Sequence, residues 1–222
     1  MQSHIKQMKS NIRNYSYNKK ELQLSPENTM IIIDWDDTLY PSSWLMNKSI
    51  DITNPTSRYK YIENFENLDT HLSKMLLFLL RFGDILIITN AMPTWIELSS
   101  SVLPKTRKVL KNIDIISARE RYQNGNKMSE WKKQTFLDEM IARNTYKKYN
   151  NILSLGDAEF EYNALINLFD KNFIPNKYLK AIKFIKSPDY DTVVEQIKIV
   201  HDNIQKICNA KRHLDLTFSN SD

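Results

Sequence analysis

Cysteine is almost absent from this chain. Its 222 residues include one cysteine, Cys208, and four histidines that stand far apart in the sequence. A single cysteine excludes an internal disulfide framework, and the scattered histidines have no spacing typical of a zinc site. A chain of this length can bury a good core, so we expect its stability to come from hydrophobic packing.

Long apolar runs are also missing. The longest is MLLFLL, residues 75–80, whereas a membrane-spanning helix needs about 20 apolar residues. The first twenty residues lack the apolar centre of a secretory signal. We therefore expect an intracellular, soluble protein, cytoplasmic by default, with no membrane partner.

The composition is that of a globular protein with a mildly basic surface. Hydrophobic residues make up 41% of the chain and aromatic residues 11%, with a formal net charge of +5. This balance suits an anionic substrate. Because Lys and Arg are spread along the chain, however, the sequence has no motif specific for nucleic acid.

Three acidic residues directly follow a run of isoleucines. Residues 31–33 read as a strand buried on both faces, and Asp34, Asp36 and Asp37 mark its end. In extended backbone Asp34 and Asp36 project to the same side, while Trp35 points away. Converging carboxylates repel each other, and a hard cation or a shared proton relieves that repulsion. The alternative is simple turn chemistry at the end of a strand.

Apolar runs alternate with segments of helical periodicity along the chain. Short apolar runs predict five strands, and helical spacing separates most of them. The strands are expected at residues 30–34, 84–89, 113–117, 151–155 and 181–186. The main helices are expected at 68–82, 93–104 with a second helical piece from there to about 112, 129–141, 159–169 and 191–212. This order predicts an α/β, three-layer Rossmann-like fold: a central, mostly parallel sheet of about five strands with helices on both faces.

The ends of the chain are expected outside this fold. Residues 1–28 form a basic N-terminal arm, residues 29–213 the folded domain and residues 214–222 a C-terminal tail. In the arm, Arg13, Tyr15 and Lys19 belong to a mixture of basic and aromatic residues found in nucleic-acid-binding arms, although a solvated tail is the commoner identity of such a segment.

Polar residues cluster where the predicted strands end. In an open parallel sheet, function gathers at the carboxyl ends of the strands. The polar side chains expected there are Asp34 and Asp36, then Thr89 and Asn90, then Asp157 with Glu161 one turn further on. Lys132 and Lys133 lie near the start of the predicted helix between the third and fourth strands. The combination is far more specific than any one of its members.

These residues resemble the four motifs of the haloacid dehalogenase superfamily, in its phosphatase branch. The motifs read DWDDT at 34–38, IITN at 87–90, a lysine at Lys132 or Lys133, and GDAEFE at 156–161. The resemblance covers roughly residues 30–186 and implies a Mg²⁺-dependent phosphoric monoester hydrolase. Because the segment between residues 39 and 65 reads as a loop or small flap, the resemblance also implies an enzyme with no large cap domain.

The resemblance assigns a role to each motif residue. Asp34 is the nucleophile that forms an aspartyl-phosphate, and Asp36 is the general acid and base. Thr89, Asn90 and Lys132 bind the phosphoryl group, and Lys132 is preferred to Lys133 because it shares the inward face of Phe136. The expected ligands of Mg²⁺ are Asp34, the backbone carbonyl of Asp36, and Asp157, and Glu161 is expected to orient water bound to the metal.

Other residues near the motifs have plainer explanations. Asp37 is the acid that the mechanism needs least, and capping of backbone N–H groups is its better interpretation. Trp35, Trp95 and Trp131 are more typical of a core than of a substrate site. The expected partner is a phosphorylated small molecule or macromolecule, such as a phosphoprotein or a nucleic-acid end. The alternative function is a non-catalytic module of the same fold that binds nucleic acid or protein.

Overall fold

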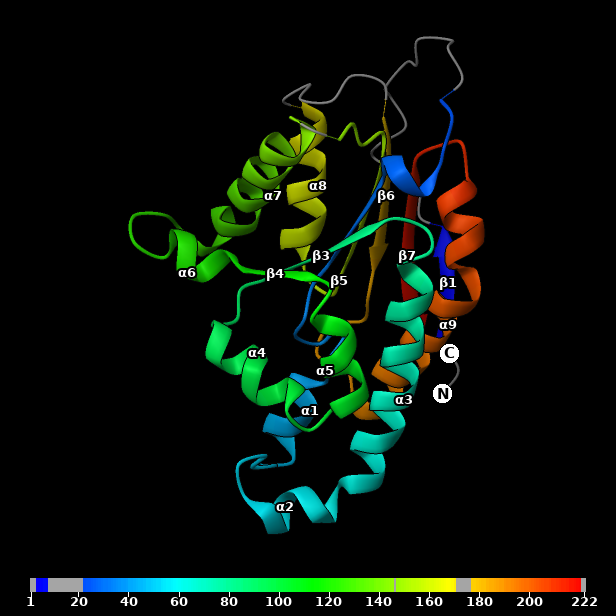
Figure 1. The fold of residues 1–222 in the computed structure, drawn as a ribbon. Coiled ribbons are helices and arrows are strands. Elements are labelled where there is room, and N and C mark those ends of the chain that lie inside the picture. The colour runs from blue at the N-terminus through cyan, green and yellow to red at the C-terminus, as the bar shows by residue number, and fades with distance from the viewer. Residues whose placement is uncertain (1–2, 8–21, 146, 171–176, 221–222) are drawn as a thin grey trace.

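A computed structural model describes residues 3–7, 22–145, 147–170 and 177–220 (Figure 1). The strands are β1 (Ser3–Gln7), β2 (Thr29–Ile33), β3 (Asp84–Thr89), β4 (Asp114–Ser117), β5 (Asn151–Gly156), β6 (Tyr178–Lys183) and β7 (Leu214–Asn220). The helices are α1 (Ser42–Asn47), α2 (Pro55–Lys60), α3 (Ile62–Leu79), α4 (Pro93–Ser100), α5 (Pro104–Leu110), α6 (Ala118–Tyr122), α7 (Met128–Asn144), α8 (Glu159–Asp170) and α9 (Tyr190–Asn209), with a short 3-10 turn, η2, at Pro26–Asn28.

One sheet passes through the middle of the molecule. Its strand order is β1-β7-β6-β5-β2-β3-β4. The six strands from β7 to β4 run parallel, and β1 pairs antiparallel with β7 at one edge. The strand that precedes the acidic cluster, β2, lies between β5 and β3. The predicted α/β, mostly parallel fold is therefore confirmed.

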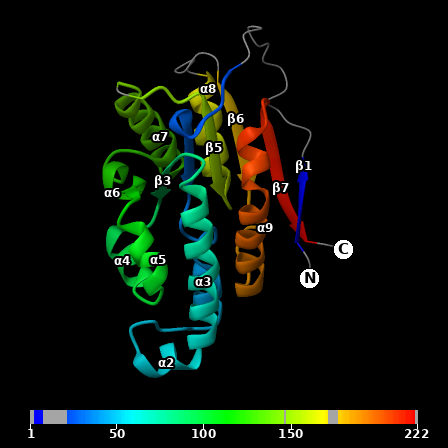
Figure 2. The same ribbon diagram turned by 45° about the vertical axis from the view of Figure 1, so that its right-hand side comes forward.

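Helices cover both faces of the sheet, as the alternation of side chains along β2 requires. Ile31 and Ile33 belong to one core, shared with residues of α3, α4, α5 and α9. Met30 and Ile32 belong to a second core, shared with residues of α7 and α8. Figure 2 shows the two groups of helices on opposite sides of the strands. Because β2 is buried on both faces, nothing but its end is available for polar chemistry.

The sheet has more strands than the sequence predicted. Strands β1 and β7 fall in the segments that we expected to be an arm and a tail. The pattern of β7 is nevertheless regular, because Leu214, Leu216 and Phe218 alternate and are buried. The fifth predicted strand is also shifted, since β6 occupies residues 178–183. Arg13, Tyr15 and Lys19 of the predicted arm lie outside the described residues.

The segment between β2 and α3 contains two short helices, where the sequence predicted a loop or small flap. Helix α1 follows the acidic cluster directly, and α2 begins at Pro55, with the Asn54 side chain accepting hydrogen bonds from the N–H groups of Thr56 and Ser57. Figure 1 shows this segment beyond the carboxyl end of β2, near α4. Within the described ranges, no helix is both long enough and apolar enough to cross a bilayer.

Candidate active site

The carboxyl ends of three neighbouring strands carry the predicted site residues. Asp34 follows β2, Thr89 ends β3 and Asp157 follows β5. The backbone N–H of Asp34 donates to the carbonyl of Leu155, 2.9 Å away, so Asp34 stands level with the end of β5. The parallel order of the strands thus brings residues 34, 89 and 157 to one edge of the sheet.

A buried lysine lies beside Asp34. Continued alternation after β2 turns Asp34 toward the face covered by α7 and α8, whereas Trp35 enters the opposite core. From α7, the Nζ atom of Lys132 lies 2.7 Å from Oδ1 of Asp34. Both side chains are buried. Such an ion pair is costly to desolvate, and it is retained where its geometry serves a purpose.

Lys132 also pairs with Glu161 of α8. Burial alone would lower the pKa of Lys132, but the carboxylates of Asp34 and Glu161 outweigh burial and raise the pKa well above its usual value. The lysine therefore stays charged. Lys133, the other predicted candidate, is partly exposed and pairs with Glu130 at 2.8 Å. The structure thus places Lys132, rather than Lys133, beside Asp34.

Three carboxyl groups converge next to this lysine. Single carboxylate oxygens of Asp34, Asp157 and Glu161 all lie within 4.8 Å of one another. Burial and the neighbouring Asp34 raise the pKa of Asp157 to about 8. Burial also raises the pKa of Glu161. Crowded oxygen donors that resist ionisation fit a hard divalent cation such as Mg²⁺, whose charge relieves the repulsion between them.

Gly156 allows Glu161 to reach this cluster. A Cβ atom at Gly156 would lie 2.3 Å from Cγ of Glu161, which is far closer than any normal contact. The Glu161 side chain thus folds back against the backbone of β5, where its Oε2 atom also accepts the N–H of Ala158 at 3.1 Å. Gly156 begins the GDAEFE motif, but the sequence alone does not indicate its role in admitting Glu161.

Asp36 has different neighbours from Asp34. Its Oδ1 atom accepts hydrogen bonds from Oγ of Ser42 and from Nε1 of Trp95, the latter at 2.8 Å. Asp34 pairs with Lys132 of α7, whereas Asp36 contacts Ser42 of α1 and Trp95 of α4. The chain turns directly after Asp36, at Asp37, which has a φ of 54°. Burial raises the pKa of Asp36, although both hydrogen bonds oppose this effect.

Asp37 caps the following helix. Its Oδ1 atom accepts the backbone N–H of Ser43 at 2.8 Å. This is the capping role that the sequence predicted. Ser42 and Trp95, by contrast, were not predicted to contact the site. Trp95 was assigned to the core, and pattern alone contains no signal for its contact with Asp36 across 59 residues.

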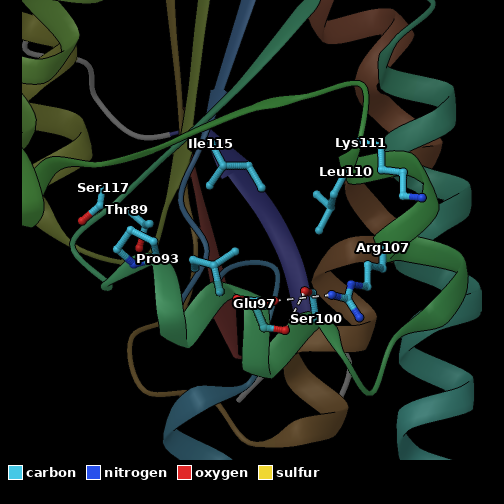
Figure 3. Close-up of a pocket in the computed structure, with 10 residues that line it drawn as sticks. Thr89, Pro93, Glu97, Ser100, Arg107, Leu110, Lys111, Ile115 and Ser117 are labelled. Carbon is cyan, nitrogen blue, oxygen red and sulfur yellow. Dashed lines mark hydrogen bonds and ion pairs between the residues drawn. The ribbon is translucent and has the colours of Figure 1, made fainter.

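Thr89 and Asn90 lie at the same edge of the sheet without bonding to Asp34. Thr89 is buried, and its hydroxyl oxygen accepts the N–H of Ala91 at 3.0 Å, which leaves its own proton available for donation. The amide oxygen of Asn90 is buried and has no hydrogen-bond partner among the described residues. Thr89 also lines a pocket of about 420 Å³ beside α4 and α5, with Arg107 and Lys111 on its far wall (Figure 3).

Comparison with known proteins gives similarity of fold. No family model matches the chain, and no curated protein matches it in sequence. The effector Ceg4 of Legionella pneumophila is similar in structure, with a TM-score of 0.51 and 9% identity, over 86% of this chain and 99% of that one. At this identity the similarity concerns the fold alone.

Two further solved structures are less similar. The HAD domain of the Legionella pneumophila effector Lem4 has a TM-score of 0.47 and 14% identity, over 83% of this chain and 98% of that one. Cytosolic 5'-nucleotidase IIIB bound to cytidine has a TM-score of 0.39 and 13% identity, over 87% of this chain and 80% of that one. These two scores are too low to support an argument about function.

Proposed function

We propose that this chain is a haloacid dehalogenase-like phosphatase that hydrolyses a phosphate monoester through an aspartyl-phosphate. The observation that carries the proposal is the buried contact of 2.7 Å between Asp34 and Lys132, within a cluster that includes Asp157 and Glu161. A nucleophilic carboxylate, a fixed positive charge and a set of acidic oxygens are the parts that phosphoryl transfer requires.

In the first step, a carboxylate oxygen of Asp34 attacks phosphorus, and the bond between phosphorus and the ester oxygen breaks. Asp36 gives its proton to the departing oxygen, so the alcohol leaves as a neutral molecule. The raised pKa of Asp36 favours the protonated form that this step needs. Because the dehalogenase branch lacks an acid at this position, Asp36 also favours phosphate chemistry over dehalogenation.

In the second step, water attacks the aspartyl-phosphate and gives a proton to Asp36. The bond between phosphorus and Asp34 breaks, and inorganic phosphate and the original carboxylate result. Lys132 holds its charge next to the transferring group throughout, because its pKa is well above neutrality. The Thr89 hydroxyl and the backbone N–H of Asn90 would bind phosphoryl oxygens.

Mg²⁺ would be held by the carboxylates of Asp34 and Asp157 and by the backbone carbonyl of Asp36. Glu161 would orient water bound to the metal. Bound Mg²⁺ neutralises charge on the transferring phosphoryl group. The convergence of buried carboxyl oxygens supports this assignment, since burial and the neighbouring charge of Asp34 raise the pKa values of Asp157 and Glu161, and a bound cation would relieve both effects.

Hydrolysis of p-nitrophenyl phosphate by the purified full-length chain tests the proposal. We expect turnover with Mg²⁺, none with chelator, and a loss of at least about a thousandfold in Asp34→Asn, which is nearly isosteric but cannot act as nucleophile. Asp114→Asn is the matched control, because Asp114 is an exposed residue that begins the edge strand β4 and pairs with Arg143.

Equal activity of Asp34→Asn and wild type would refute the assignment of Asp34 as the nucleophile. A folded wild type that neither turns over the ester nor binds Mg²⁺ or beryllium fluoride would refute the enzyme. The non-catalytic binding module would then be the better explanation.

A further inference from the structure

A second, mostly apolar hollow lies between α4 and the segment that joins β2 to α3. It has a volume of about 340 Å³. Its apolar lining residues are Leu45, Met46, Ile50, Ile52, Trp95 and Leu98. Leu45 and Met46 belong to α1, whose first residue, Ser42, donates a hydrogen bond to Asp36, so the same helix contributes to the hollow and to the site. Figure 1 shows α1 and α4 next to each other at this end of the molecule.

Trp95 connects the hollow with the proposed general acid. Trp95 lines the hollow, and its Nε1 atom donates to Oδ1 of Asp36 at 2.8 Å. In the proposed reaction the leaving oxygen must come within hydrogen-bond reach of Asp36. The group attached to that oxygen then lies beside Trp95, whose ring offers an apolar surface with one polar edge.

The charges around the hollow select against a second anion. Its lining residues include no lysine or arginine, and Asp51 is the only charged one. Asp51 accepts hydrogen bonds from the N–H and the hydroxyl of Thr53, which fixes a negative charge at the wall. The pocket beside Thr89 differs, since Arg107 and Lys111 line it.

We propose that the hollow between α1 and α4 binds the leaving group of the substrate, and that this group is apolar and uncharged. The inference rests on the proposed function, because that function places the leaving oxygen at Asp36. It narrows the substrate to phosphate monoesters of aromatic or aliphatic alcohols. Nucleotides and sugar bisphosphates, which carry further polar or anionic groups, are disfavoured.

Two phosphonates that the enzyme cannot hydrolyse test the proposal. Benzylphosphonate and methylphosphonate present the same anion and differ by a phenyl ring. Burial of roughly 60 Å² of that ring at about 25 cal/mol per Å² corresponds to a preference of about tenfold. We expect this preference in isothermal titration calorimetry of the full chain with Mg²⁺.

Neutral polar substitutions locate the binding site of the ring. Met46 is 79% exposed, so Met46→Gln preserves the fold. It should reduce the preference for benzylphosphonate to about a half or a third of the wild-type ratio. Met46→Gln combined with Leu98→Gln should abolish it, and methylphosphonate should bind as before. Met128→Gln, an exposed methionine at the start of α7, is the matched control and should retain the full preference.

Ile115→Gln tests the neighbouring pocket, which Ile115 lines. Loss of the preference in Ile115→Gln but not in Met46→Gln would place the ring in that pocket and overturn the proposal. Equal affinity of wild type for both phosphonates, or binding of neither, would also overturn it. A tenfold preference in a protein that neither turns over p-nitrophenyl phosphate nor binds Mg²⁺ or beryllium fluoride would refute the proposed function but leave this binding site standing, so the two failures are distinguishable.

Discussion

Replacement of Lys132 by methionine tests whether the buried lysine balances the acidic cluster. Met has a similar length and no charge, so Lys132→Met leaves Asp34 and Glu161 buried without their common partner. Removal of one member of a buried ion pair typically costs about 3–5 kcal/mol. For a chain of this size, 1 kcal/mol changes the melting temperature by about 2–4 °C. We therefore expect a decrease of roughly 6–20 °C in chelator.

Lys133→Met is the matched control for this experiment. Lys133 is the next residue on the same helix, and its pair with Glu130 is largely exposed. Such pairs contribute at most about 1 kcal/mol. Thermal unfolding followed by circular dichroism should therefore separate the two variants clearly. Turnover of p-nitrophenyl phosphate should fall by at least about a hundredfold in Lys132→Met, and by less than about twofold in Lys133→Met.

Mg²⁺ provides a further test of the same reasoning. If Asp34 and Asp157 hold the cation, its charge replaces part of the charge lost with Lys132, so Mg²⁺ should raise the melting temperature of Lys132→Met more than that of wild type. Equal stability of the two lysine variants in chelator would refute the reasoning. Unchanged turnover in Lys132→Met would show that the lysine has no role in the reaction.

Two other predictions concern crowding and pH. Gly156→Ala should destabilise the fold by about 1–3 kcal/mol and reduce turnover, because the new methyl group displaces Glu161. Gly83→Ala is the control, because its methyl group would crowd Thr29 at the opposite end of the sheet. Urea unfolding should show a similar loss of stability in Gly83→Ala, with unchanged turnover per folded molecule. Lys180 is buried with a pKa lowered by burial to about 8, and its Nζ donates to the carbonyl of Cys208. Between pH 8 and pH 10.5, its ordinary value, the unfolded chain binds more protons, so wild-type stability gains with rising pH. Lys180→Met should thus be more stable than wild type by about 2 kcal/mol at pH 7, after allowance for the lost hydrogen bond. This difference should shrink as the pH rises toward 10.5. A difference in urea unfolding that stays constant with pH would contradict the prediction.

The sequence predicted the centre of the sheet well because strong local signals coincide there. Strands β2 and β3 contain continuous apolar runs, and that of β5 is interrupted only by Ser154; such runs are the pattern of strands buried on both faces. The helical period of α7 placed Lys132 on the same face as Phe136, and both are buried. Those two regularities are sufficient to bring Asp34 and Lys132 together.

The edges of the sheet were harder to predict because their signals are weak. Strand β1 contains a single large apolar residue, Ile5, and its pairing with β7 joins segments more than 200 positions apart in register, such as Ser3 with Asn220. A strand whose place depends on so distant a partner has little local pattern of its own. The charges and polar residues of both segments suggested solvated ends instead.

The neighbours of Asp36 show where periodicity ceases to inform. The extended backbone continues as far as Asp36, and the positive φ of Asp37 then turns the chain, so that from Asp37 onward side-chain direction depends on the loop and not on strand geometry. The same turn lets α1 begin at Ser42, beside Asp36, and lets α4 present Trp95 from the other side. The contacts of the proposed general acid and the proposed leaving-group site therefore depend on the residues that follow this turn, whereas the position of the proposed nucleophile, Asp34, depends on the strand itself.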